Sequence, residues 1–492
     1  MKTETISHTI KINLTGGIVS PGDLFTILEQ AERCGVRNVH IGNRQQLLFT
    51  IDHEKMDDLV ERFEVNEIDF ESDSDEYPNI MSSYVTEEVL YTPNWLREGV
   101  YKDILDSFSY RPRLKINIVD YSQNLIPFFT GNLNFISSSV SNFWYLYIRF
   151  PKTTTMYCWP SLVYSEDIAG ISEVIESVIF RSPDLFYNNP DIKGQQLVER
   201  VGKENGFLMQ EFDHPLIHTD FQLPYYEGFN KYRENKLWLG IYRRQEDFNV
   251  EFLKDICTLC SKTRIGQLYT TAWKSLIIKN IDLPDRIYWS NLLNNYRINV
   301  RHAANELNWQ LEDLCEEALT LKTQLVREFE EADLRTYRLC FAIKTKPRTG
   351  LFGSVVIRKR STRGRGGSIL YEVLHTRDFN PNSKDYVSID REVRQHQLGS
   401  KLIAICESYY LLRDKLASGS GPASEQSKTL PAVVASSWQC QLCLTCYNEQ
   451  YGDTANGLQP GISFESLEYY NCPVCDSSKE NFQPLKVSVA PV

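Results

Sequence analysis

Two segments far apart in the chain carry the same order of apolar and polar positions. Residues 16–52 begin with apolar residues at helical spacing, continue through a polar turn into a short strand at Val39–Ile41, and close on an apolar run at Leu47–Ile51. Residues 249–282 repeat this order, with a short strand at Gln267–Tyr269 and an apolar run at Leu276–Ile281. The period is far longer than the roughly 20–50 residues of a solenoid. The pattern therefore predicts two similar α+β halves.

Each half is followed by a longer segment of mixed character. After the first half, residues 115–132 and 143–151 have the composition of strands. After the second half, the apolar spacing from Ala304 to Glu331 predicts a long helix. Strands are then expected at 338–345 and 353–358, before a basic glycine-rich loop at 358–368 and a last helix near 397–413.

Composition narrows the class of protein. Of 492 residues, 42% are apolar and 24% charged, which is typical of a soluble globular chain of about three domains. The net charge of −11 argues against a nucleic-acid binder. No apolar run reaches the roughly 18 residues of a membrane span, and the start lacks the apolar core of a signal peptide. We expect a cytoplasmic protein without membrane insertion, whose cysteines are free thiols or metal ligands.

Two compositional shifts suggest boundaries. Residues 61–76 hold eight carboxylates against one arginine, which is typical of a solvated helix end and loop. Residues 415–437 are rich in Gly, Ser, Ala and Pro and predict a flexible tether with a span of roughly 25 Å. The expected parts are a first half domain (1–75), core module 1 (76–235), a second half domain (236–300), core module 2 (301–414), a linker (415–437) and a small module (438–492).

The small module concentrates five of the 12 cysteines. Cys440-Gln-Leu-Cys443 and Cys472-Pro-Val-Cys475 are two C-x2-C pairs, and each places two thiolates on one tight turn. Two such turns complete a tetrahedral four-sulfur site, which suits iron or zinc. Because a module of this size has little core of its own, a bound metal would also stabilise its fold. Cys446 leaves a second pairing open, with Cys443, although the surrounding residues favour the 440/443 pair.

The spacing around these pairs resembles rubredoxin. The resemblance rests on Trp438-x-Cys440-x2-Cys443-x3-Tyr447, Gly452-Asp453-x3-Gly457, Pro460-Gly461-x2-Phe464 and Tyr470-x-Cys472-Pro-x-Cys475-x3-Lys479-x2-Phe482. It implies one iron ion, cycling between Fe3+ and Fe2+, on Cys440, Cys443, Cys472 and Cys475. It also implies an aromatic core of Trp438, Tyr447, Phe464, Tyr470 and Phe482. Two positions depart from the family, where glycine usually follows each pair: here they are Leu444 and Asp476.

The long N-terminal part resembles siroheme nitrite and sulfite reductases. The resemblance rests on Gly17, Arg33-Cys34-Gly35 and Asn43-Arg44-Gln45, and on Thr271-Ala272-Trp273-Lys274 in the second copy. It implies an α+β fold of duplicated ferredoxin-like half domains with mixed core modules. That family holds a [4Fe–4S] cluster on C-x5-C and C-x3-C, whereas this segment offers only Cys315 and Cys340. We therefore expect no [4Fe–4S] cluster, and the cysteine deficit argues against siroheme.

Other candidate sites are weaker. Cys257-x2-Cys260 lies on one face of an apolar helix, where such cysteines usually pack as small hydrophobes. Arg44, Lys274, Lys344 and Lys346 could pair with siroheme carboxylates, or be structural cations. His214 and His218 are separated by a helix-breaking Pro215, and the basic loop at Gly364-Arg-Gly366-Gly367 is expected to be a hairpin tip.

Three functions fit these observations. The first is an electron carrier whose iron module exchanges electrons with a donor and an acceptor reductase, on a non-catalytic scaffold that docks a partner in nitrite or sulfite assimilation. The second is a siroheme- or flavin-binding reductase with a fused donor. The third is a zinc-bound docking module without redox function. The sequence leaves open whether the protein is an enzyme and favours the first.

Overall fold

The computed structural model divides the chain into two units, which we describe separately. One comprises Met1–Phe229 with Arg233–Cys406, and the other Asn230–Tyr232 with Glu407–Val492. The structure describes residues 6–90, 94–189, 192–202, 206–212, 216, 221–346, 350–361, 369–383, 385–417, 437–440, 446–449, 453, 456, 458–459, 461–472 and 477–484.

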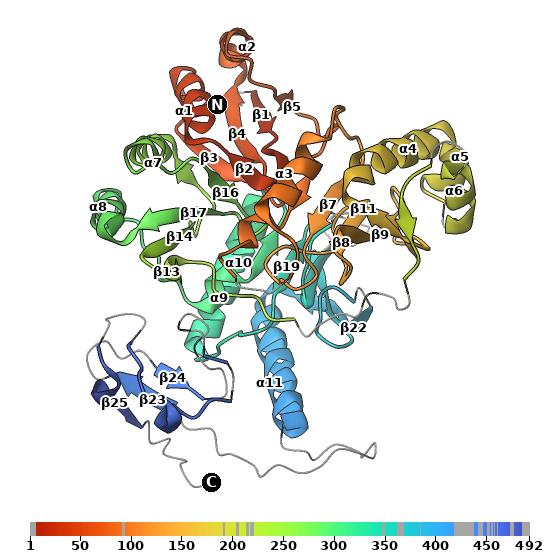
Figure 1. Ribbon diagram of the computed structural model, residues 1–492. Helices are drawn as coiled ribbons and strands as arrows, with labels where there is room; N and C mark the ends of the chain where they lie inside the picture. The colour runs from red at the N-terminus through yellow and green to blue at the C-terminus, as the bar shows by residue number, and fades with distance from the viewer. Residues whose placement is uncertain are drawn as a thin grey trace. The chain divides into compact units, whose positions relative to one another are not determined.

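The predicted repeat forms two five-stranded sheets of similar build (Figure 1). The strand order of the first sheet is β15 (Phe248–Asn249), β3 (Asn38–Ile41), β4 (Leu47–Asp52), β1 (Ser7–Ile12) and β5 (Glu71–Ser72). The order of the second is β13 (Gly228–Arg233), β14 (Lys236–Tyr242), β17 (Ser275–Asp282), β16 (Leu268–Thr270) and β2 (Ile18–Val19). Each half lends a two-residue strand to the other's sheet, because β15 pairs with β3 and β2 pairs with β16.

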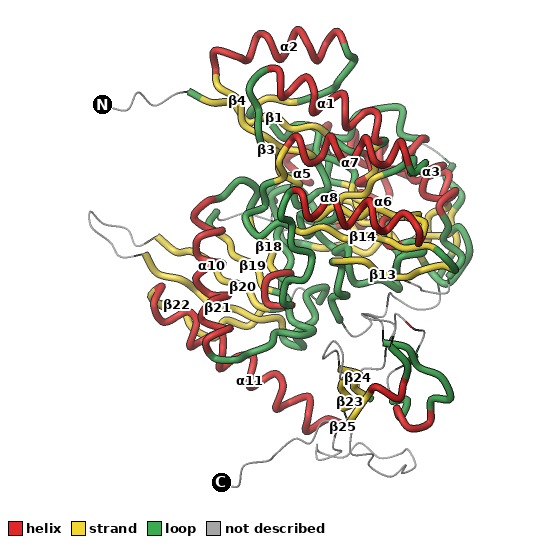
Figure 2. Tube along the Cα trace, turned by 90° about the vertical axis from the view of Figure 1, so that its left-hand side faces the viewer, coloured by secondary structure: helices red, strands yellow, loops and turns green. Residues whose placement is uncertain are grey.

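Four helices cover these sheets in a row, and each contacts the next (Figures 1 and 2). In order they are α2 (Met56–Val65), α1 (Pro21–Arg33), α7 (Val250–Lys262) and α8 (Arg286–Asn295). The N-terminal caps of α1 and α7 repeat as well: the side chain of Ser20 accepts the N–H of Asp23, and that of Asn249 accepts the N–H of Phe252. The apolar faces of both halves meet in one continuous core, so the halves fold as one body.

The two core modules repeat a second pattern. In module 1, β6 (Met81–Ser82), β7 (Ile116–Val119) and β8 (Leu133–Ser137) run parallel, and β9 (Phe143–Arg149) and β11 (Leu162–Tyr164) follow antiparallel. In module 2 the same order recurs in β18 (Trp309–Leu311), β19 (Phe341–Lys344), β20 (Val355–Ser361), β21 (Ile369–Thr376) and β22 (Tyr386–Arg394). The first sheet adds β10 (Met156–Cys158) and β12 (Met209–Gln210). The duplication therefore extends to the core modules.

Helices follow each core sheet at matching places. A 3-10 turn and a helix come after the last long strand in both modules, as Ser165–Asp167 with α4 (Ile168–Arg181) and Gln395–Gln397 with α11 (Leu398–Ala417). The other helices of these modules are α3 (Glu98–Asp106), α5 (Pro183–Phe186), α6 (Gly194–Val201), α9 (Ala304–Leu307) and α10 (Glu316–Glu331). Among the described residues, no helix is long and apolar enough to cross a membrane.

Two sequence-based expectations were wrong in detail. The long helix expected from Ala304 to Glu331 is interrupted, because Trp309–Leu311 pairs with β19 as a parallel strand before α10 begins. The strand expected over 115–132 is only β7, and the residues after it fold back in turns. Side-chain amides hold these turns, since Gln123 accepts the N–H of Ile126 and donates to its carbonyl.

Candidate metal centre

The C-terminal module is built on a three-stranded antiparallel sheet in the order β24 (Cys446–Asn448), β23 (Ser437–Cys440), β25 (Phe482–Pro484). Trp438 faces Tyr447 on one neighbour and Pro484 on the other, and Cys440 faces Phe482. This register places Cys440, the first cysteine of the Cys440-x2-Cys443 pair, at the end of the central strand.

Cys440 and Cys472 are buried in the same small core. Their exposed fractions are 0% and 2%, and they share a cluster with Tyr447, Phe464, Tyr470 and Phe482. The rings are closely packed, with Trp438 stacked on Phe464 at 5.0 Å between centroids. All five aromatic residues expected in this core are therefore found there, with Trp438 at its edge.

The chain folds back tightly at Cys472. The N–H of Cys472 donates a 2.8 Å hydrogen bond to the carbonyl of Ser477, and Asn471 and Ser478 form an antiparallel bridge. The hydroxyl oxygen of Ser477 lies 3.2 Å from the sulfur of Cys440. One residue thus contacts both buried cysteines, which come from opposite ends of the module.

Cys440 and Cys472 are the two proposed ligands that the structure describes, and their placement fits one metal site. Two thiols that the sequence separates widely are buried together, and thiolate is the ligand that iron and zinc share. Cys443 and Cys475 lie outside the described residues, as do Leu444 and Asp476. Among the residues that the structure does describe, no group of three or more His, Cys, Asp or Glu side chains is arranged around a metal position.

Polar side chains fix the loops of the module. The buried carboxylate of Glu449 accepts hydrogen bonds from the N–H of Phe464 and the hydroxyl of Ser463, both on one oxygen. Gly461 donates to the carbonyl of Glu449 at 2.7 Å and has a φ of 91°, a conformation that favours glycine. Sequence reasoning missed Glu449 and Ser477, because neither belongs to a cysteine motif and only the folded chain shows their contacts.

Among the described residues, the cysteines of the N-terminal part belong to no group of three or more possible metal ligands. Cys257 and Cys260 are buried in the core of the half domains, where burial raises the pKa of Cys257 to about 12 and that of Cys260 further. Cys315 contacts Thr345, just after β19, whereas Cys340 stands just before that strand. The four residues of β19 lie between Cys340 and Thr345, and these five residue steps span roughly 17 Å, which is too far for one metal.

The cations considered for siroheme have different environments. The guanidinium of Arg44 is buried and donates to the carbonyls of Asn79 and Ile116 and to the amide oxygen of Asn117. Lys274 is buried and paired with Glu246 at 2.5 Å. Lys344 is half-buried, and among the described residues no carboxylate lies within ion-pair distance of its ammonium. Lys346 is exposed.

Arg149, at the end of β9, is close enough to two of these cations, Arg44 and Lys344, to affect their pKa values. Burial lowers the pKa of Arg149 itself, and its guanidinium donates a hydrogen bond to the carbonyl of Thr130. Burial also lowers the pKa of Arg44 to about 10 and of Lys344 to about 8, and repulsion from Arg149 adds to both shifts. Burial, Arg44 and Arg149 also lower the pKa of Lys115, against the opposing effect of Asp75, which is paired with its ammonium at 3.2 Å. Arg149, at the end of β9, and Lys344, at the end of β19, are thus close enough for their charges to repel each other.

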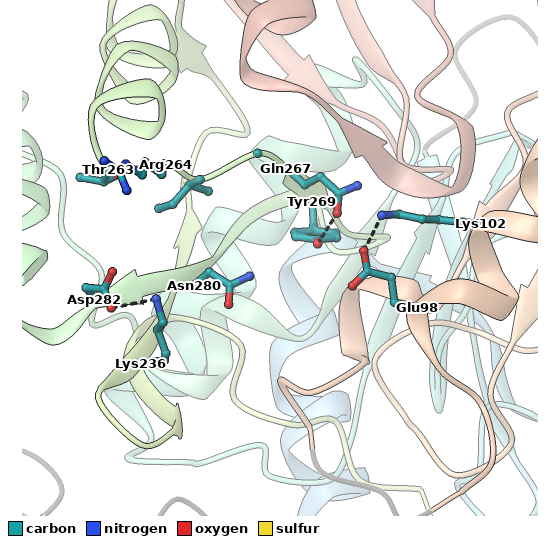
Figure 3. Close-up of a pocket in the computed structure, with 11 residues that line it drawn as sticks. Glu98, Lys102, Lys236, Thr263, Arg264, Gln267, Tyr269, Asn280 and Asp282 are labelled. Carbon is teal, nitrogen blue, oxygen red and sulfur yellow. Dashed lines mark hydrogen bonds and ion pairs between the residues drawn. The ribbon is translucent and has the colours of Figure 1, made fainter.

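A separate surface cavity of about 580 Å³ lies beside α3 and the second sheet (Figure 3). Four of its five charged side chains are paired with each other, Glu98 with Lys102 at 2.5 Å and Lys236 with Asp282 at 2.8 Å, and the fifth is Arg264. This mutual pairing is typical of a solvated cleft. Two weaker candidates from the sequence, the pair His214 and His218 and the loop at Gly364–Gly367, lie outside the described residues.

Comparisons with known proteins distinguish the two parts of the chain. A sequence model of the Rubredoxin family matches residues 437–482. Over 46 residues, 9% of this chain and 88% of the relative, the chain is 44% identical to Rubredoxin-2 of Chlorobaculum tepidum. That family implies an iron ion held by cysteines and a role in electron transfer.

The longer N-terminal part is similar in fold to a solved structure, that of the Mycobacterium tuberculosis NirA protein. The TM-score is 0.60 at 12% identity, and the match covers 80% of this chain and 79% of that chain. At this identity the similarity shows the fold alone, and it confirms the predicted duplicated α+β architecture. Through its C-terminal module, this chain belongs to the rubredoxin family, and it joins that module to a NirA-like fold.

Proposed function

We propose that this protein carries single electrons on an iron centre held by Cys440, Cys443, Cys472 and Cys475. The observation that carries the proposal is the burial of Cys440 and Cys472 in one aromatic core, at the start of two C-x2-C turns. An iron ion with four thiolate ligands supplies one-electron transfer with little change of geometry. The aromatic core holds the two cysteine segments in place and excludes water from the sulfur atoms of Cys440 and Cys472.

In this proposal the N-terminal part is a scaffold that docks a redox partner in the cytoplasm. Its NirA-like fold supports a partner from nitrite or sulfite assimilation, by analogy of fold alone. Cys340 lies just before β19, and Cys315 contacts Thr345 just after it. This separation supports the proposal that the N-terminal part binds no [4Fe–4S] cluster and does not catalyse the six-electron reduction. The tether predicted at 415–437 begins in α11 and ends in β23, and its residues 418–436 lie outside the described residues. In this proposal the tether would let the module reach a donor and an acceptor in turn, at an effective concentration near the mM range.

A second candidate is a reductase whose N-terminal part binds a cofactor rich in carboxylates, such as siroheme. The cations around Arg149 favour it, because Arg44, Lys115 and Lys344 lie close enough to Arg149 for repulsion to lower the pKa of each. An anionic ligand would offset that repulsion. In this case the residues of the cluster would bind and orient the ligand, and the rubredoxin module would be its donor.

Metal analysis and a visible spectrum of the full-length protein, before and after dithionite, test both candidates. One iron per chain with a colour that bleaches on reduction, and no tetrapyrrole or flavin bands, is the result expected for the electron carrier. Stoichiometric siroheme or flavin bands would favour the reductase. A colourless protein with one zinc, unchanged after refolding with iron, would contradict both and favour a docking module without redox function.

A further inference from the structure

Ser477 stands out because its side chain reaches a sulfur that is 37 residues away in the sequence. Its hydroxyl oxygen lies 3.2 Å from the sulfur of Cys440, within hydrogen-bond distance for sulfur. The sulfur is fully buried, whereas Ser477 is half-buried at the edge of the core. The contact therefore joins a polar O–H group to a sulfur that water does not reach.

The backbone holds Ser477 in this position. Its carbonyl accepts the N–H of Cys472 at 2.8 Å, and the bridge between Asn471 and Ser478 closes the same turn. Lys479, just beyond, donates to the carbonyls of Glu465 and Leu467. The backbone of Ser477 is thus fixed on both sides by contacts that do not involve Cys440, and the hydroxyl is one rotatable bond away from it.

Metal binding fixes the direction of this hydrogen bond. A cysteine that binds a metal is a thiolate and has no proton to donate, so the Ser477 hydroxyl must donate to the Cys440 sulfur. Reduction adds one negative charge to the centre, which is shared with the sulfur atoms. A donor at sulfur therefore stabilises the reduced form more than the oxidised form, and more strongly in a buried place.

We propose that Ser477 is a positioning residue that raises the reduction potential of the iron centre through the sulfur of Cys440. This inference rests on the proposed electron-transfer function. The step it affects is a one-electron reduction in which the partner donor is oxidised, no bond breaks, and the hydroxyl keeps its proton. The chain would thereby set which donors can reduce it.

The test compares Ser477→Ala with Ser478→Ala in the full-length protein. Ser478 is the neighbouring exposed serine, and its hydroxyl accepts a bond from Asn481 and contacts no cysteine among the described residues. The measurements are iron content, the visible spectrum and a redox titration. We expect Ser477→Ala to keep one iron and to disfavour reduction threefold to tenfold, a negative shift of about 28 to 59 mV. Ser478→Ala should leave the potential unchanged.

Two further variants keep the result decisive. Ser477→Thr retains the hydroxyl and should restore a potential near that of the wild type. Ser477→Gly also removes the hydroxyl. If Ser477→Ala fails to take up iron, the same negative shift of the potential is expected in Ser477→Gly. Unchanged potentials in iron-loaded Ser477→Ala or Ser477→Gly would overturn the role of Ser477 alone. A wild-type protein that binds no redox-active iron would overturn the proposed function together with it.

Discussion

The phenol of Tyr470 donates a 2.7 Å hydrogen bond to the carboxylate of Asp453, which lies 17 residues earlier in the chain. Burial and the neighbouring carboxylate both raise the pKa of Tyr470, so the phenol remains protonated and continues to donate. The bond ties the loop that contains Asp453 to the segment that leads into Cys472. One contact therefore links Asp453 to the aromatic core and to the segment that leads into Cys472.

Replacing Tyr470 with phenylalanine should weaken the module without emptying its metal site. Tyr470→Phe keeps the ring contacts with Tyr447 and Phe464 but loses a hydrogen bond to a charged group, which costs about 1.5–3 kcal/mol. We expect one iron per chain and a lower midpoint of thermal unfolding, followed by the visible absorption of the centre. Tyr469→Phe is the control, because Tyr469 is 91% exposed and should not change the midpoint. Equal midpoints for both variants would contradict this role of Tyr470.

Replacing a proposed ligand should act on the small module alone. Cys475→Ser removes one of four thiolates, and a module with so small a core depends on its metal for folding. We expect loss of iron and rapid proteolysis of residues after 437, with the thermal transition of residues 1–414 retained. Cys446→Ser is the matched control and should keep its iron, because Cys446 is expected not to bind metal. Full iron content in Cys475→Ser would overturn the ligand assignment.

The cysteine pair in α7 should serve packing and not metal binding. Cys257 and Cys260 are 2% and 0% exposed in the shared core of the half domains, and burial keeps their thiols protonated. The double variant Cys257→Ala/Cys260→Ala should retain the metal content of the wild type and lose about 1–3 kcal/mol of stability. Metal analysis with denaturant unfolding checks both expectations. Loss of one metal equivalent would reveal a second centre.

The sequence predicted most of what is set by local spacing. The two C-x2-C pairs and the aromatic positions around them identify the module, and the helix of each half domain follows from its apolar period. Contacts between segments that are distant in the sequence could not be predicted from it. The exchange of β2 and β15 rests on two-residue strands whose partners lie more than 200 residues away, and no local pattern specifies such pairing.

The same limit explains the errors around the candidate sites. The strand Trp309–Leu311 exists because β19 pairs with it, whereas its residues also continue an apolar helical period. Arg149 is an ordinary strand residue in the sequence, and no local pattern predicts that its charge acts on Lys344, which belongs to the other core module. Ser477 likewise gains its importance from a fold that brings it to Cys440.

The charge cluster around Arg149 leads to a prediction about pH and stability. The pKa of Lys344 is lowered to about 8, first by burial and then by Arg358 and Arg149, whereas an unfolded lysine titrates near 10.5. Below pH 8 Lys344 is charged in the folded protein, and burying this charge lowers the free energy of unfolding by its full amount. As the pH rises from 8 toward 10.5, the unfolded chain binds more protons than the folded one, so stability increases.

Removing that charge should therefore stabilise the N-terminal part. Lys344→Met should raise its free energy of unfolding by about 1–3 kcal/mol at pH 7, and the gain should shrink between pH 8 and 10. Denaturant unfolding of the full-length protein at several pH values measures it. Lys346→Met is the control, because Lys346 is exposed, lies two residues after Lys344 and should give no gain in stability.

A gain in stability in Lys344→Met would mean that the lysine is kept at the expense of stability, as expected for a residue that binds an anion. A loss of stability at pH 7 would instead show that Lys344 has a structural role, and would remove the support that the cluster gives to the reductase candidate.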